Sequence, residues 1–179
     1  MPEITFPVLK KQLPPAMVEV ISATPLSPLD AGDAVESIAK YIAVNGDLER
    51  SAEWNSLQID LVCSGLWLLA GELDRSHDIS QSIKTPEGSF LHGIMHRREG
   101  DFGNSKYWFR QVGPHAVYAQ IAQAGGGVPE ELQADGALDP YAFVDACQSA
   151  VRGKSNARPL EQIQWNEWQA LMADILPSE

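Results

Sequence analysis

The 179-residue chain carries a formal net charge of −11, and 44% of its residues are hydrophobic. This length suffices for one domain with a substantial core, and the hydrophobic content argues against wholesale disorder. The acidic balance argues against sequence-independent binding to nucleic acid or to an anionic membrane, because both need a basic surface. Small ligands remain compatible with this charge.

The start of the chain lacks the charged-then-apolar pattern of a signal peptide. The longest apolar segment, 57–73, contains Gln58 and Asp60 and is too short to predict a membrane span. Cys63 and Cys147 lie in apolar, helix-like stretches, which favours buried thiols over a secreted disulfide framework. We therefore expect a cytoplasmic protein, and the oligomeric state stays open.

The first half of the chain predicts an arm followed by two helices. Residues 1–29 hold six prolines, which favours an extended arm across the surface. A helix is expected to begin at Ser27 or Asp30 and to end at Val44, before a turn at 45–47. A second, from Ser51 or Ala52 to about Asp74, is apolar nearly all round and is expected to be central and buried.

The second half predicts five more helices. Thr85 is a plausible N-cap and Pro86 a first helical residue for a helix that ends at Glu99. Glycine-rich 125–127 and the segment 134–138 are expected to be flexible connectors. The remaining helices are expected over 107–112 (capped by Asn104), 115–124, 140–151 and 160–176. Residues 30–179 thus predict one all-α domain, an irregular bundle of about seven helices.

Three of the four histidines lie within 92–115, the segment richest in groups that bind metals or move protons. On a helix at 100° per residue, His92, His96 and Glu99 share an arc of about 60°. Two histidines four residues apart on one helix face are a common ligand pair for a divalent transition metal such as zinc, nickel, copper or iron. The spacing therefore predicts a candidate metal site on His92, His96 and Glu99.

Several alternatives for these histidines remain open. Asp101 or His115 could complete the metal shell, as could Glu72, Asp74 and His77, if the end of the central helix packs nearby. Gly93 stands where the zinc-protease motif needs its glutamate, which disfavours a peptidase of that type. Without a metal, His96 and His115 could act as catalytic acid–base groups oriented by Glu99. The histidines could also be a hydrogen-bonded structural pair.

A basic aromatic stretch follows the histidines. Lys106 and Arg110 lie four residues apart beside Tyr107 and Trp108, and Arg97 lies upstream. Guanidinium and ammonium groups beside aromatic rings can bind a small carboxylate or phosphate. We expect a small anionic ligand here, with His77 as a further contact. The alternative is that these cations pair with the abundant Asp and Glu side chains.

The run from His92 through His115, with its HGIMHRRE and KYWFR segments, resembles a family of uncharacterised bacterial and fungal proteins. The resemblance also includes Ser76-His77-Asp78 and covers about a quarter of the chain. It implies no activity, cofactor or catalytic assignment. It favours treating six residues as one constellation: His77, His92, His96, Glu99, Arg110 and His115.

The leading hypothesis is a small-molecule-binding protein with its site on 92–115, and a metal-dependent enzyme is one form of this hypothesis. The competing hypothesis is a non-enzymatic helical interaction module in which the same residues form a structural polar core. That module would use an exposed apolar patch, including Trp165 or Trp168, as its working surface.

Overall fold

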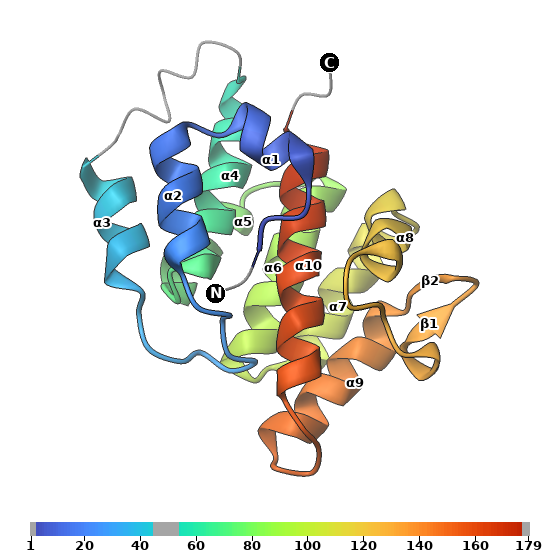
Figure 1. The fold of residues 1–179 in the computed structure, drawn as a ribbon. Coiled ribbons are helices and arrows are strands. Elements are labelled where there is room, and N and C mark those ends of the chain that lie inside the picture. The colour runs from blue at the N-terminus through green and yellow to red at the C-terminus, as the bar shows by residue number, and fades with distance from the viewer. Residues whose placement is uncertain (1–2, 45–53, 177–179) are drawn as a thin grey trace.

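The computed structural model describes residues 3–44 and 54–176. These residues form ten α-helices and one short antiparallel hairpin, which confirms the all-α prediction (Figure 1). The helices are α1 (Pro7–Gln12), α2 (Pro15–Ala23), α3 (Glu36–Val44), α4 (Ser56–Leu69), α5 (Leu73–Ser80), α6 (Pro86–Glu99), α7 (Phe102–Val112), α8 (Ala116–Gln123), α9 (Pro140–Val151) and α10 (Arg158–Ile175). A 3-10 helix, η2 (Glu130–Leu132), precedes the strands β1 (Gln133–Ala134) and β2 (Ala137–Leu138).

Helix α6 lies at the centre of the bundle. It packs on α4, α5, α7 and α9, and every residue from 88 to 98 is buried. Figure 1 shows α10 in front of α6, with α1 to α3 on one side and α8 and the hairpin on the other. The predicted central helix, α4, is also largely buried, but the helix that carries His92 and His96 is the more enclosed one.

The prediction of an extended N-terminal arm is wrong, because prolines there begin helices. Pro7 and Pro15 are the first residues of α1 and α2, where the missing N–H costs no helical hydrogen bond. Both helices bury apolar side chains in the main core, namely those of Leu9, Met17 and Ile21.

Two predicted helix boundaries also need correction. The first predicted helix begins later, at Glu36, and the segment before it is irregular. The second is divided into α4 and α5 by Gly71, whose φ of 75° favours glycine. This turn directs α5 back along α4 and α6, so the division matters for the site. The turn predicted at 45–47 lies outside the described residues.

Cap chemistry explains the predictions that are confirmed. The Thr85 hydroxyl accepts a hydrogen bond from the Gly88 amide, and α6 spans the predicted residues. Helix α9 begins at Pro140 after the Asp139 cap, also as predicted. Helix α7 begins earlier than predicted because Asp101 is its cap, and 134–138 contributes a hairpin instead of a flexible connector.

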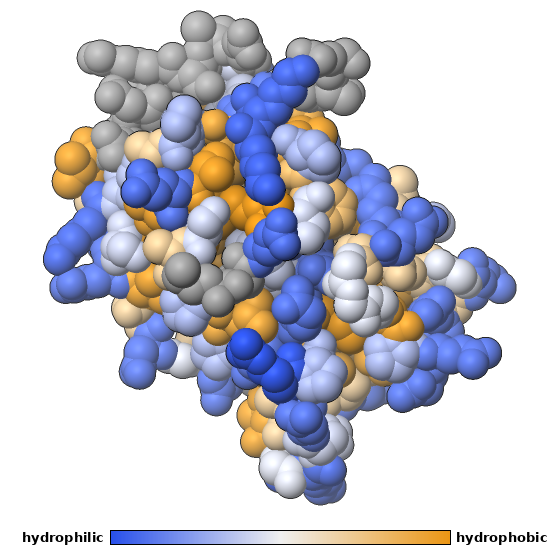
Figure 2. Space-filling model, in the orientation of Figure 1, coloured by the Kyte–Doolittle hydropathy of each residue, from blue (hydrophilic) through white to orange (hydrophobic). Residues whose placement is uncertain are grey.

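The described surface is mixed in character. On the face in Figure 2, hydrophilic side chains lie between several separate hydrophobic areas. Among the described helices, none combines the length and the apolar composition that crossing a membrane requires.

Candidate metal centre

The site begins with the close approach of α6 and α7. A side chain at Gly93 would come within 3.1 Å of the Phe109 ring, so glycine lets the two helices pack tightly. The Ser105 hydroxyl donates a 2.8 Å hydrogen bond to the Gly93 carbonyl oxygen and ties the helices together. The glycine inside the His-Gly-x-x-His segment therefore has a packing role.

Three imidazoles meet beside this contact. His92 and His96 project from α6 and stack with ring centroids 4.7 Å apart, while His77 projects from α5. The His77 ring lies edge-on to both, at 4.7 Å from His92 and 5.7 Å from His96. One ring nitrogen from each histidine lies within 4.8 Å of the other two. A tetrahedral zinc ion needs nitrogens about 3.3 Å apart, so side-chain rotations would have to close the remaining gap.

Burial favours the neutral form of His92 in this cluster. His92 is 2% exposed, and burial followed by the neighbouring His96 and His77 lowers its pKa to about 4. Its Nδ1 atom is buried and has no hydrogen-bond partner. A neutral imidazole with an unused buried nitrogen is the form that binds a metal ion, and it is costly to keep without a partner.

Glu99 orients the second imidazole. Its Oε1 lies 2.5 Å from Nδ1 of His96 and can only accept, so in the neutral ring Nδ1 carries the proton and Nε2 has the lone pair. The side-chain amide nitrogen of Asn104, Nδ2, lies 3.0 Å from Nε2 and 3.4 Å from Nδ1 of His96. Because these two nitrogens flank one ring carbon, the amide must lie over the ring face. The Nε2 lone pair in the ring plane is left for another partner.

Glu99 is therefore a hydrogen-bond acceptor in this structure, and His77 takes the third place beside His92 and His96. A second set of potential metal ligands does include Glu99, together with His96 and Asp101. Both carboxylates of this group already have partners. Glu99 accepts from His96, and Asp101 caps α7 by accepting a hydrogen bond from the backbone N–H of Asn104. The three-histidine group is consequently the stronger metal candidate.

His115 lies in a separate cluster with Glu87 and Asp174. Its Nε2 is 3.7 Å from the Glu87 carboxylate and 3.9 Å from that of Asp174. Its Nδ1 accepts a hydrogen bond from the Val117 amide, so in the neutral ring the proton is on Nε2. A metal on Nε2 would need that proton moved to Nδ1, at the expense of the helix cap. We therefore interpret His115 as a cap facing two carboxylates.

The basic residues expected to bind an anion do not converge on the histidines. Lys106 forms a 2.6 Å ion pair with Asp145 of α9. Arg110 is exposed on the same face of α7 as Lys106, whereas Trp108 faces His92. Tyr107 is also exposed and touches Trp108 edge-on. Apart from His77, which belongs to the histidine cluster itself, Trp108 is the one residue of this predicted anion-binding set that contacts the cluster in the described structure.

Arg97 and Arg98 hold the bundle together. Arg97 is fully buried, forms an ion pair with Glu167 at 2.5 Å and stacks on Phe143. Arg98 donates hydrogen bonds to backbone carbonyls of Asp30, Ala31 and Leu68. The two Nη atoms of Arg97 are hydrogen-bonded inside the protein, and its Nε is buried without a partner. Arg97 therefore has no free donor pair to offer a ligand.

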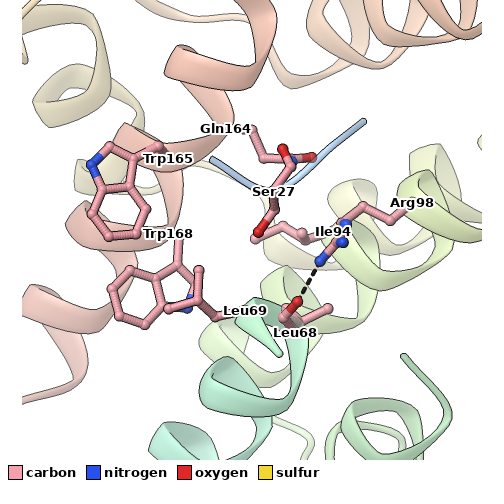
Figure 3. A pocket seen from close by; sticks show the side chains of 8 residues that line it. All are labelled: Ser27, Leu68, Leu69, Ile94, Arg98, Gln164, Trp165 and Trp168. Atoms are coloured by element: carbon pink, nitrogen blue, oxygen red, sulfur yellow. Dashed lines mark hydrogen bonds between the residues drawn. The ribbon is translucent and has the colours of Figure 1, made fainter. Parts of the chain in front are cut away.

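A small cavity lies between α4, α6 and α10 (Figure 3). Its volume of about 20 Å³ suits a single water molecule. Trp165 and Trp168 line it, are 3% and 5% exposed, and donate hydrogen bonds to the carbonyls of Glu3 and Gly65. These tryptophans are core residues, so they cannot form the exposed patch expected of an interaction module.

The sequence predicts His92 and His96 at the metal centre and His77 only if the end of the central helix packs nearby. It predicts Asn104 only as a helix cap, and no sequence pattern singles out Glu167. Comparisons with protein-family models, curated proteins and solved structures give no match. The interpretation of the site therefore rests on its geometry, and the resemblance of the 92–115 segment stays untested.

Proposed function

We propose that this protein binds one divalent transition-metal ion through His77, His92 and His96. The single observation that carries the proposal is the convergence of three ring nitrogens within 4.8 Å, one histidine having an unpartnered buried nitrogen. Imidazole donors favour zinc, nickel, copper or iron over calcium and magnesium, which prefer oxygen. The hydrogen bond from His96 to Glu99 is the kind of outer contact that orients a metal-binding histidine.

Three protein ligands leave an exchangeable position on the metal. Structural zinc sites have four protein ligands, whereas catalytic sites have three and keep one position for water or substrate. We therefore propose that the small molecule binds at this position, with metal-assisted hydrolysis as the reaction class to assay. Arg110 and Lys106 have no part in this proposal because they face away from the histidines.

Metal content measured by elemental analysis tests the proposal. Chelator-treated protein is reloaded with zinc, and we expect about one equivalent in the wild type and much less in His77→Gln, His92→Phe and His96→Gln. The matched control is His115→Asn, which removes an imidazole but keeps a helix-capping side chain. Circular dichroism confirms that each variant is folded.

Two results would contradict this proposal. One is a full equivalent of zinc in the folded His92→Phe and His96→Gln variants. The other is loss of zinc in His115→Asn with retention in the other three variants, which would assign the metal to the Glu87–His115–Asp174 cluster.

A further inference from the structure

A cavity of about 320 Å³ opens where α5 begins and α6 ends. Three of its lining residues are acidic: Glu72, Asp74 and Glu99. The others are Ala31, Gly71 and Leu73. Arg75 reaches Glu72 at 3.9 Å, but its guanidinium lies over the Trp67 ring and is not part of the lining. We call this cavity the acidic mouth.

The acidic mouth lies about one helical turn from the nearest histidine on each of the two helices. Helices α5 and α6 pack together, and the start of one meets the end of the other at the mouth. One turn into α5 from Leu73 is His77, and one turn back along α6 from Glu99 is His96. His92 is one turn deeper still. The mouth and the three-histidine centre are therefore consecutive layers between the same two helices.

Glu99 connects the two layers. Its side chain is 39% exposed and lines the mouth, while its Oε1 binds the His96 ring. His96 and His92 are buried beyond it, and Nδ1 of His92 has no hydrogen-bond partner. Exposed carboxylates thus lie outside the two buried imidazoles of His96 and His92, and the His77 imidazole is half-buried.

We propose that the acidic mouth is the route by which a divalent cation reaches the three-histidine centre. This inference rests on the proposed metal-binding function. A cleft lined by one sign of charge concentrates counter-ions and raises association rates by about 10- to 1000-fold. Carboxylate oxygens hold the hydrated cation loosely, and the imidazoles then bind the transition metal more strongly.

The test measures how fast cobalt(II) binds to the metal-free 179-residue chain. Stopped-flow absorbance compares the wild type with the double variant Glu72→Gln/Asp74→Asn, in which Glu99 stays intact. Glu130→Gln/Glu131→Gln on η2 is the control, because it removes the same number of charges away from the mouth. We expect association of the mouth variant to slow about tenfold at low salt, with a smaller difference at high salt. Its cobalt stoichiometry and dissociation rate should stay unchanged.

The possible outcomes separate this route from the metal site itself. Cobalt bound at an unchanged rate by the mouth variant would overturn the route and leave the three-histidine site standing. Equal slowing in the control would overturn it too, since net charge would then be the cause. Loss of stoichiometric cobalt from the mouth variant would show that Glu72 or Asp74 is a ligand, which is a different assignment. Failure of wild-type protein to bind cobalt would remove the proposed function and this inference together.

Discussion

The His92 imidazole stacks on the Trp108 indole, with ring centroids 4.1 Å apart and planes 19° from parallel. The opposite face of the same imidazole stacks on His96. His92 is thus held between a residue of α7 and a residue of α6. The indole is the nearest aromatic reporter of any event at the three-histidine centre.

Trp108 should report metal binding by its fluorescence. Nickel or copper bound at the centre should quench the Trp108 emission, because the indole is stacked on a ligand ring. Trp108→Phe keeps an aromatic ring against His92, so metal affinity measured by calorimetry should change little. Most of the quenching should disappear in this variant. Quenching of unchanged size in Trp108→Phe would place the metal near another tryptophan.

Acid should destabilise the metal-free protein through His92. The pKa of His92 is lowered from 6.5 to about 4 by burial and by His96 and His77, so the unfolded chain takes up this proton first. The free energy of unfolding should therefore fall as the pH drops from about 6.5 to 4, by at most about 3 kcal/mol. Urea denaturation of wild type and His92→Phe at pH 7 and pH 4.5 isolates the contribution of this residue. A pH dependence that is identical in the two proteins would contradict the assignment.

Local chemistry made α6 predictable, whereas its neighbours depended on distant contacts. Thr85 and Pro86 are a cap and a first residue, and neither needs a tertiary partner to act. The N-terminal prolines fit an extended arm and a helix start equally well by sequence. Burial of Leu9 and Met17 against the rest of the core stabilises the helices, and no local pattern contains that information.

The candidate site was likewise predictable only where local sequence patterns determine it. His92 and His96 share one helix face through local periodicity, so their pairing follows from spacing alone. His77 joins them because Gly71 ends α4 and returns the chain as α5, which a continuous predicted helix concealed. Arg97 looked available for a ligand because its partner, Glu167, is 70 residues away in the sequence.

Glu99 should tune metal affinity without setting the stoichiometry. Its carboxylate accepts the His96 Nδ1 proton, so Glu99→Ala frees the ring to rotate and makes Nε2 a weaker donor. We expect metal affinity to fall by about 10- to 100-fold in a chelator competition, with one equivalent still bound at saturation. Asp101→Asn is the control, because asparagine also caps a helix and should leave the affinity unchanged. A loss of affinity in Asp101→Asn as large as in Glu99→Ala would favour the group formed by His96, Glu99 and Asp101.

Arg97 should matter for stability and not for metal affinity. Its guanidinium and the Glu167 carboxylate are both fully buried, so Arg97→Met leaves an unpaired buried carboxylate and should cost about 3 to 5 kcal/mol in urea denaturation. Arg97→Met/Glu167→Leu removes both charges and should recover most of that loss. Metal affinity of the folded double variant should match the wild type. Equal stabilities of the single and double variants would show that the ion pair is not what holds α6 against α10.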